Sequence, residues 1–340
     1  MPPYYWLKRL VVARPGSVGV RLYGLLFSPS RGFFTFSPFF LLVLGGAVWF
    51  LRPVKRHSLF LFSLTWFVLQ LVIVARATRW WGGWSYGPRL LTEVIPAFVL
   101  LTILLWRELS PRLTARRRYA LVAAYLLLGA AGIFINSAQG LYNEETQRWN
   151  GALAPNVDFF PEYLLSWRYP QFLASPDSLC RRHWAFVNDE LRQNHIQLAP
   201  YGPGEVITHD APDAKAFFVG WGQPGGVVRW SVCPSSAVLF PLPALDSGRS
   251  YLLSVTVAST GDQVVRMVLN GVPVGTGALA GRPAAPATYS LPIAGEWLKP
   301  DEVNELAFHM ANATTTAVQD GGEPRIAFVS LGINSQGEPP

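Results

Sequence analysis

The sequence predicts a multidomain membrane protein, in which four transmembrane α-helices precede an extracytoplasmic antiparallel β-sandwich of the jelly-roll kind. Three observations support this fold class. Half of the 340 residues are hydrophobic and only 14% are charged, whereas a typical soluble domain is about 25% charged. The long apolar runs all lie within the first 135 residues. Beyond residue 215, apolar residues recur instead in short runs bounded by turn residues, which is typical of strands.

The four predicted spans are the apolar runs at the start of the chain: Ser37–Leu51, Ser58–Ala75, Leu90–Trp106 and Tyr119–Ile135. A bilayer requires about 20 apolar residues, and the "RGFFTF" that precedes the first run can supply the turn that it lacks. Helices that are apolar on all faces over this length are rare in soluble cores. We therefore expect an external or interfacial segment over residues 1–36 and a membrane region over residues 37–135.

Charge sets the predicted orientation. Residues 1–140 carry a net charge of +14, and residues 141–340 a net charge of −7. The cations flank apolar runs instead of forming a soluble basic patch, so they do not indicate nucleic-acid binding. Residues 52–57 and 107–118 are short basic loops, the second with five arginines. The positive-inside rule makes both loops cytoplasmic.

With this orientation, both chain ends and everything after Ile135 lie outside an inner (plasma) membrane. An external N-terminal segment of 36 residues without a signal peptide is difficult to insert. We therefore expect the chain to be the C-terminal part of a longer polytopic protein, whose upstream half would be a partner.

The remainder of the chain is predicted to form an external linker over residues 136–204 and a β-sandwich over residues 205–335. The linker holds a candidate amphipathic helix over Ser178–Leu198. In the sandwich, Asn270-Gly271 separates two apolar runs and predicts a two-residue hairpin. Two cysteines, at positions 180 and 233, can form a disulfide outside the cytoplasm. They can equally be unrelated thiols, because sequence does not give the Cα–Cα distance.

The densest aromatic cluster, "WWGGWSYGPR" at residues 80–89, lies in the predicted external loop between the second and third spans. Its aromatic residues fit a belt at headgroup level, which is the first interpretation for Trp80 and Trp81. Its glycines also permit close approach of a ligand to the backbone. Arg89 can hold a phosphate by paired hydrogen bonds, or it can anchor a helix end at the interface.

Two further charged residues lie near this loop. Glu93 is the only carboxylate within a predicted span, four residues after Arg89, at salt-bridge spacing for an α-helix. The two form either a functional pair at the mouth of a cavity or an interfacial ion pair. Arg31 lies in "FSPSRGFFTFSP", which is either an ordered loop on the same side of the membrane or an ordinary turn with an exposed arginine.

No metal or cofactor site is predicted. The five histidines show no metal-ligand spacing, and no phosphate loop, dinucleotide fingerprint or nucleophile elbow occurs in a strand-to-helix context.

Three motifs in this order carry a family resemblance: "GLLFSPSRGFFTFSP", "WWGGWSYGPRLLTEVIP" and "LLSWRYPQFL". Over residues of about 20–175, the chain resembles the C-terminal half of bacterial polytopic glycosyltransferases of the GT-C type, which include dolichyl-phosphate-mannose–protein mannosyltransferases and aminoarabinose transferases. The resemblance implies a polyprenyl-phosphate sugar donor and a site at the external membrane face. It gives donor-side roles to Arg31, Tyr86 and Arg89, and Trp84 and Glu93 complete the candidate donor-binding set.

The chain also departs from this family. The family's general base is an Asp or Glu in the first external loop, which has no counterpart here. The catalytic residue is therefore unknown, and we expect no activity from this chain alone. The competing hypothesis is a non-catalytic membrane-anchored module whose β-sandwich binds a glycan or a partner protein. A transporter subunit fits less well, because the predicted spans contain one carboxylate, no cation and no repeat.

Overall fold

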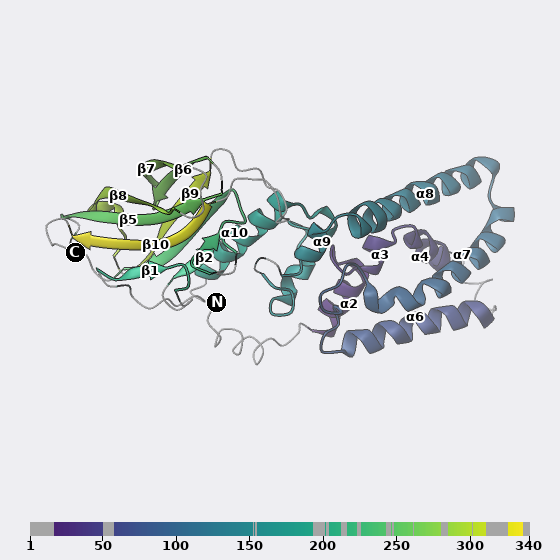
Figure 1. Ribbon diagram of the computed structural model, residues 1–340. Coiled ribbons are helices and arrows are strands. Elements are labelled where there is room, and N and C mark those ends of the chain that lie inside the picture. The colour runs from purple at the N-terminus through teal and green to yellow at the C-terminus, as the bar shows by residue number, and fades with distance from the viewer. Residues whose placement is uncertain are drawn as a thin grey trace. The chain divides into compact units, whose positions relative to one another are not determined.

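The computed structural model of the protein (Figure 1) describes residues 17–49, 58–151, 153, 155–192, 201, 204–211, 216–222, 226–242, 246, 248–260, 262–279, 285–300, 302–310 and 326–335. The chain divides into two compact units. A helical unit lies within Val11–Ser178, and a β-rich unit contains Leu179–Pro340.

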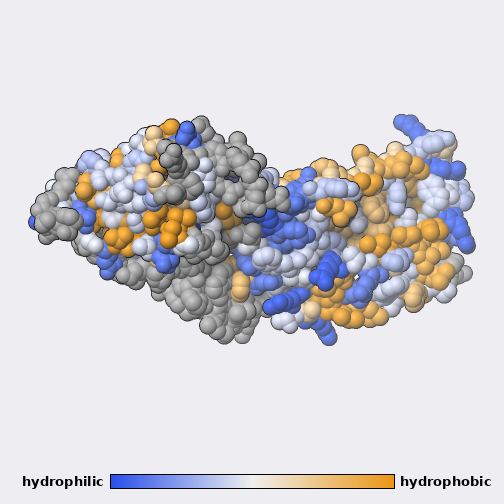
Figure 2. Space-filling model, in the orientation of Figure 1, coloured by the Kyte–Doolittle hydropathy of each residue, from blue (hydrophilic) through white to orange (hydrophobic). Residues whose placement is uncertain are grey.

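Helices and turns make up the first unit. Its α-helices are α2 (Val18–Phe27), α3 (Phe33–Phe36), α4 (Phe40–Trp49), α6 (Ser58–Arg76), α7 (Ile95–Leu109), α8 (Ala115–Ile133) and α9 (Glu145–Arg148). The 3₁₀-helices are η1 (Arg89–Val94), η2 (Ser110–Arg112), η4 (Pro161–Leu165) and η5 (Gln171–Leu173), and η3 (Phe134–Leu141) is a π-helix. Among the described residues, three helical runs are long and apolar enough to cross a membrane: Ser58–Arg76, Arg89–Arg112 and Ala115–Leu141. Apolar side chains cover much of their surface in Figure 2.

The first predicted span is not confirmed. Over the described residues, helix α4 has 10 residues, which is a length of about 15 Å, half the thickness of a bilayer core. Residues 50–57, which include the predicted loop 52–57, lie outside the described residues. The expectation that "RGFFTF" extends this span is wrong. It forms the separate helix α3, and Ser37 leaves the helical conformation with φ −133° and ψ 64°. The physical reason is Pro38, since a proline disfavours the helical conformation of the residue before it.

The phenylalanines of α3 instead fill the interior of the helical unit. The ring centroids of Phe33 and Phe98 lie 4.9 Å apart, and Phe40 and Phe98 are separated by the same distance. The ring of Phe67 packs edge-on against Phe98 at 4.8 Å. All four side chains are buried. Because lipid is as apolar as these side chains, close packing of this kind holds membrane helices together.

The second unit is a sandwich of antiparallel sheets. Its strands are β1 (Val206–Thr208), β2 (Phe217–Val219), β3 (Arg229–Trp230), β4 (Ser235–Pro241), β5 (Ser250–Ser259), β6 (Gln263–Leu269), β7 (Val272–Leu279), β8 (Ala287–Ala294), β9 (Val303–Met310) and β10 (Ile326–Ser335). One sheet, here called sheet 1, has the order β1-β10-β5-β8, with β3 also paired to β10. The other, sheet 2, has the order β2-β4-β9-β6-β7.

The strand order is that of a jelly roll with two added short strands, β2 and β3. Without these two, the first and last strands, β1 and β10, are neighbours in sheet 1, and the next strands inward along the chain, β4 and β9, are neighbours in sheet 2. Wrapping a chain in this way around two sheets is what defines the jelly roll. The predicted antiparallel sandwich is therefore present.

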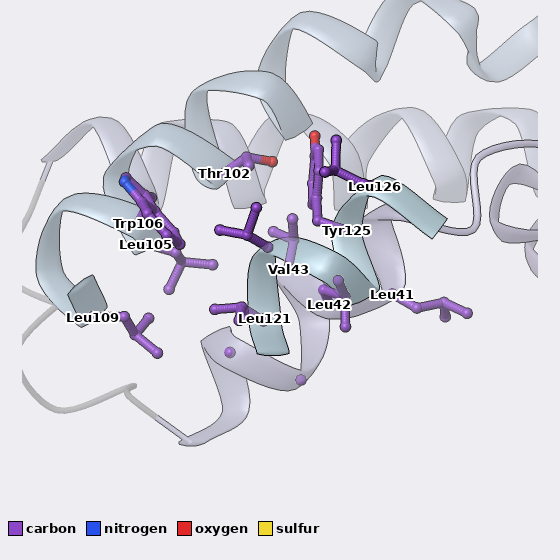
Figure 3. Close-up of a pocket in the computed structure, with 13 residues that line it drawn as sticks. Leu41, Leu42, Val43, Thr102, Leu105, Trp106, Leu109, Leu121, Tyr125 and Leu126 are labelled. Atoms are coloured by element: carbon purple, nitrogen blue, oxygen red, sulfur yellow. The ribbon is translucent and has the colours of Figure 1, made fainter. Parts of the chain in front are cut away.

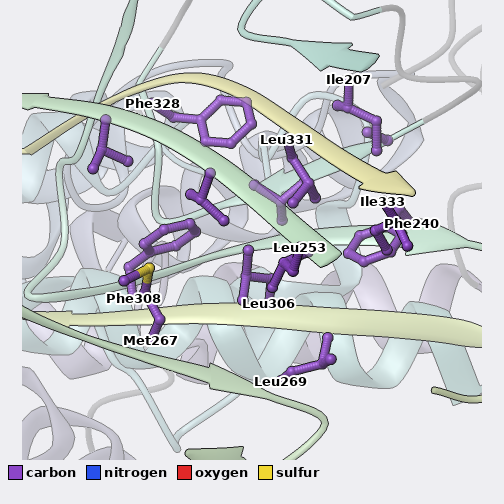
Figure 4. Packing of buried hydrophobic residues seen from close by; sticks show 14 of the residues in the cluster. Ile207, Phe240, Leu253, Met267, Leu269, Leu306, Phe308, Phe328, Leu331 and Ile333 are labelled. Atoms are coloured by element: carbon purple, nitrogen blue, oxygen red, sulfur yellow. The ribbon is translucent and has the colours of Figure 1, made fainter. Parts of the chain in front are cut away.

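The core of the sandwich lies between the two sheets (Figure 4). Alternate residues point into it: on β5 these are Tyr251, Leu253, Val255 and Val257, and on β6 they are Val265, Met267 and Leu269. Side chains of this size each stabilise the fold by about 1.5–3 kcal/mol when fully buried. Because successive side chains of a strand point to opposite faces, the residues between these core positions lie on the outer surfaces of the two sheets.

The hairpin predicted at Asn270-Gly271 joins β6 to β7. Both residues have positive φ, 50° and 87°, as a type I′ turn requires. Asn270 is further held by its side chain, because Nδ2 donates to the carbonyl of Trp297 at 2.8 Å and Oδ1 accepts from the backbone N–H of Glu305 at 2.9 Å.

A disulfide joins Cys180 to Cys233, with Cα atoms 5.8 Å apart. Cys180 belongs to α10 (Pro176–Arg192), and Cys233 precedes β4. A second contact reinforces the attachment, since the indole N–H of Trp184 donates to the carbonyl of Ser235 at 3.2 Å. Helix α10 is therefore fastened to sheet 2, and the pairing that the sequence left open is settled.

Candidate functional site

In the helical unit, the buried guanidinium of Arg31 lies at the centre of a cluster of loops. Its side chain is 1% exposed. Its Nε–H donates to the carbonyl of Trp81 at 2.9 Å. Its two Nη groups donate to the carbonyls of Ser30 at 2.8 Å and Gly83 at 3.2 Å, to Oδ1 of Asn150 at 2.7 Å and to Oε1 of Gln171. These five bonds match the five N–H donors of an arginine.

The Arg31 cluster holds loops from distant parts of the chain together. Gln171 continues the network, because its Nε2 donates to the carbonyls of Thr146 at 2.7 Å and Ser85 at 3.1 Å. Burial lowers the pKa of Arg31 to about 9, while the carboxylate of Asp158 acts in the opposite direction. The guanidinium therefore remains charged at neutral pH. With every donor directed at the protein, Arg31 positions the loops around it.

The interpretation of Trp80 and Trp81 as belt residues is wrong. They are only 3% and 6% exposed, and the indole N–H of Trp81 donates to Oδ1 of Asp158 at 3.0 Å. The ring of Trp80 lies so close to Gly24 that a Cβ there would be 2.3 Å from it. Both side chains pack inside the protein because the loop folds back, with Gly82 at φ 77°.

The other aromatic residues of this loop differ in exposure. Trp84 is 52% exposed, and its indole N–H donates to Oδ1 of Asn156 at 3.4 Å. Tyr86 is half-buried and donates its hydroxyl to the carbonyl of Ile135 at 2.6 Å. Burial raises the pKa of this phenol. Trp84 is thus the aromatic surface of the loop that is open to a ligand, whereas Tyr86 ties the loop to η3.

Arg89 and Glu93 do not form the expected pair. Both are exposed, and within the described part of the chain no ion pair joins them. Glu93 Oε2 instead accepts a long bond of 3.5 Å from Nε2 of Gln70. The cause is local, since residues 89–94 form the 3₁₀-helix η1. With three residues per turn, positions four apart point about 120° away from each other. Arg89 is left as an exposed cation on this loop.

Sequence reasoning missed the acceptors of Arg31. Gln171 lies within the motif "LLSWRYPQFL", and its polar side chain among apolar neighbours was a usable signal. Asn150 offered no such signal, because one sequence does not reveal contacts between residues more than 100 positions apart. The same holds for Asp158, whose charge acts on Arg31 and whose carboxylate accepts a hydrogen bond from Trp81.

A second candidate site is the outer face of sheet 1. The ladder places Thr208, Ser330, Thr256 and Thr288 in one row across β1, β10, β5 and β8. The next row is Val206, Gly332, Ser254 and Ser290, and a third contains Asn334, Leu252 and Pro292. None of these side chains is charged. The hydroxyls of Thr256 and Thr288 are 2.9 Å apart, and that of Thr208 donates to Oδ1 of Asp210 at 2.6 Å.

An aromatic ring lies on the same face. Trp230 of β3 pairs with Ala327 of β10. Its neighbour Arg229 points to the core, where its guanidinium lies 4.0 Å from the ring centroid of Phe218. Alternation therefore puts the half-buried Trp230 side chain on the outer face. The uncharged rows and Trp230 together form a surface that we call the hydroxyl face.

The outer face of sheet 2 has a different character. A row across it contains Ser235, His309, Arg266 and Thr276. Ser235 Oγ and His309 Nδ1 lie 2.9 Å apart, and Arg266 is exposed. The side chains of Phe217 on β2 and Leu239 on β4 point to the outer face of sheet 2, yet both are buried. Helix α10 is attached to this same sheet. Among the described residues, no group of His, Cys, Asp and Glu could hold a metal ion.

Comparison with known proteins relates this chain to solved structures alone. No protein-family profile and no curated protein matches the sequence. The N-terminal cellulose-binding domain of β-1,4-glucanase C from Cellulomonas fimi is 19% identical, with a TM-score of 0.30, over 41% of this chain and 99% of that domain. The carbohydrate-binding module CBM36, solved with calcium and xylotriose, is 18% identical, with a TM-score of 0.23, over 40% and 91% of the two chains.

A CBM4 module is 16% identical, with a TM-score of 0.26, over 38% of this chain and 100% of the module. These likenesses cover a part of the chain no larger than the β-rich unit, and they are too distant to indicate what this chain binds. The resemblance of residues 20–175 to GT-C glycosyltransferases stays a prediction.

Proposed function

We propose that this chain is a membrane-anchored module whose β-sandwich binds a neutral saccharide through the hydroxyl face. The observation that carries the proposal is the row of Thr208, Ser330, Thr256 and Thr288, which crosses four of the five strands of sheet 1. Hydroxyl groups both donate and accept hydrogen bonds, as sugar hydroxyls do. Trp230 adds a ring face on which sugar C–H groups can stack. The rows contain no charged side chain, and the carboxylate of Asp210 beside Thr208 would repel an anion. The ligand that matches this face is therefore uncharged.

Three apolar runs would anchor the module in an inner membrane, with the sandwich outside the cytoplasm. Two features support this orientation. The Cys180–Cys233 disulfide is of a kind that persists in oxidising compartments. The five arginines of residues 107–118 favour the cytoplasmic side. The anchor would then hold a saccharide-binding surface close to the cell envelope.

The test uses the full chain in lipid nanodiscs and a panel of neutral and acidic polysaccharides, with binding measured by affinity electrophoresis. Trp230→Ala should weaken binding to a neutral polymer about tenfold, the loss expected for one stacking contact. The pair Thr256→Val and Thr288→Val should weaken it similarly through lost hydrogen bonds.

The matched control is Thr276→Val, an exposed threonine of sheet 2, which should bind as the unaltered chain does. Equal binding by all variants, or a preference for acidic polymers, would contradict the hydroxyl face as the site.

A second candidate function is favoured by the exposed Trp84 and Arg89 on the loop that the Arg31 cluster holds. In this proposal, the chain is part of a glycosyltransferase that uses a polyprenyl-phosphate sugar. Arg89 would meet the phosphate, and Trp84 would contact the sugar. The buried Arg31 and the half-buried Tyr86 would hold the loop in place behind them, and the exposed Glu93 would complete the donor-side surface. The acceptor would be a glycan or a protein, and the upstream half of a longer chain would supply the general base.

A further inference from the structure

An apolar cavity of about 510 Å³ lies between α4, α7 and α8 (Figure 3). Its walls include Leu42, Thr102, Leu105, Leu121 and Tyr125. The Thr102 hydroxyl is already used, since it donates to the carbonyl of Phe98 at 2.7 Å. A cavity with so few free polar groups holds water poorly. It is suited to an alkyl chain.

The cavity lies toward one end of the helices. On α7 it is lined by Thr102, Leu105, Trp106 and Leu109, which share one helix face in the second half of the helix. On α8 it is lined by Leu121, Val122, Tyr125 and Leu126, near the middle of the helix. The second half of α7 and the first half of α8 adjoin the basic loop 107–118. The apolar run Arg89–Arg112 has Arg89, the candidate phosphate ligand of the second function, at its first position and Arg112 at its last. Along a helix, these two positions are about 35 Å apart.

Arginines continue the two helix faces that line the cavity. Arg112 follows Leu109 by three residues, and Arg117 precedes Leu121 by four; such spacings place side chains on one face. Arg117 is exposed and, among the described residues, has no bonded partner. Arg112 reaches Glu108 at 3.5 Å while its side chain stays 49% exposed. Deep blue surface gathers at the α7–α8 end in Figure 2.

We propose that this cavity binds one acyl chain of an anionic glycerophospholipid, whose headgroup lies against Arg112 and Arg117. Charge complementarity selects this occupant, because residues 107–118 contain five arginines and one glutamate. Basic pockets between membrane helices on the cytoplasmic side are known to bind anionic headgroups. The site is separate from the hydroxyl face, and it lies at the other end of α7 from Arg89. It rests on the helices lying in a membrane, which both proposed functions share, and it does not depend on the ligand that either function assigns.

The test is native mass spectrometry of the full chain in detergent, titrated with phosphatidylglycerol, phosphatidylcholine or glycerol phosphate. Phosphatidylglycerol should bind the most tightly. Replacing both Arg112 and Arg117 by Gln should weaken phosphatidylglycerol binding about 30-fold. Each cation near the membrane surface contributes about 1 kcal/mol, which is about fivefold in affinity. Arg76→Gln, which replaces an exposed arginine at the end of α6 that belongs to neither proposed site, should leave binding unchanged.

The acyl-chain part of the site is tested by filling the cavity. Gly46 lines it, and a Cβ there would meet Leu105 Cδ1 at 3.6 Å, an ordinary contact. Gly46→Leu should therefore fold and exclude the chain, with at least tenfold weaker phosphatidylglycerol binding. Gly129→Leu is the matched control, because a Cβ at Gly129 meets nothing within 4 Å and the residue is not part of the wall.

Three results would overturn the proposal. The first is equal binding of phosphatidylglycerol and phosphatidylcholine. The second is binding by Gly46→Leu as tight as by Gly129→Leu. The third is glycerol phosphate binding as tightly as phosphatidylglycerol, which would mean that the arginines act without the cavity. Unchanged helical circular dichroism in every variant ensures that a lost lipid reports the site and not the fold.

Discussion

Arg31 donates a hydrogen bond to the side chain of Gln171, which is 140 positions further along the chain. Both side chains are buried, at 1% and 0% exposure. The bond connects the turn between α2 and α3 to η5, and the same guanidinium reaches the carbonyls of Trp81 and Gly83. One side chain thus fixes the loop on which Trp84 and Arg89 are exposed.

Arg31→Lys should destabilise the helical unit by about 3 kcal/mol or more. A lysine offers three rotating donors from one nitrogen and does not reach acceptors arranged around a planar fork. Buried carbonyls left without a donor each cost about 1–3 kcal/mol. The measurement is thermal unfolding of the full chain in mild detergent. Arg89→Lys, an exposed arginine, is the control and should change the melting temperature little; equal effects of the two would count against the cluster.

Removing the disulfide should destabilise the attachment of α10 to the sandwich. Cys180 and Cys233 are 53 residues apart, and closing a loop of that length stabilises a fold by about 4 kcal/mol in the chain-entropy account. Cys180→Ser with Cys233→Ser should therefore unfold at lower denaturant concentration. In intact cells, a thiol reagent should label the unaltered chain only after reduction. Labelling before reduction would place the sandwich in a reducing compartment.

Arg89→Ala should weaken binding of polyprenyl phosphate to the full chain about tenfold, if the loop meets a lipid phosphate. The reason is the loss of a charge-assisted hydrogen bond, which contributes about 1.5–3 kcal/mol. Arg76→Ala removes another exposed arginine, at the end of α6, and should have a smaller effect. Equal losses in the two variants would indicate general attraction to an anionic lipid and not a phosphate site.

Much of the sandwich could be predicted from local signals. Asn270 and Gly271 predict the β6–β7 hairpin, because few residue pairs tolerate positive φ at two successive positions. The runs of alternating apolar residues predict the strands. The helical unit was harder. Residues 33–36 were predicted to extend the first span. Pro38 instead ends the helix before it, so these residues form the separate helix α3, and the side chain of Phe33 packs in the interior of the unit. The Arg31 cluster could not be predicted, since its partners come together only through tertiary folding.

The candidate pair of Arg89 and Glu93 shows how a spacing rule depends on the helix type. Four-residue spacing places side chains together in an α-helix, but η1 has 3₁₀ geometry, and sequence alone did not distinguish the two. The hydroxyl face could not be predicted either, because it too depends on geometry that the sequence does not give. Its threonines and serines lie on four separate strands, and only the register aligns Thr208 with Ser330 and Thr256 with Thr288.

Glu305 of β9 should make the sandwich more stable at low pH than at neutral pH. Burial raises the pKa of this carboxyl, and the nearby charges of His309 and Lys299 only partly oppose the shift. A raised pKa means that the folded chain binds the proton more tightly than the unfolded chain does. The resulting stabilisation is present below the unfolded pKa of about 4.3. It is lost as pH rises from that value through the raised folded pKa.

Glu305→Gln removes the carboxyl while keeping its size, so the variant should be more stable than the unaltered chain at pH 7 and should lose this part of the pH dependence. Denaturant unfolding of the full chain at pH 4, 5, 6 and 7, followed by circular dichroism of the strands, measures the difference. Glu296→Gln provides the control, because Glu296 is exposed and its replacement should leave the pH profile as it was. A Glu305→Gln variant that is less stable at pH 7 would show that the charged carboxylate contributes favourably, through His309 or Lys299, more than its burial opposes the fold.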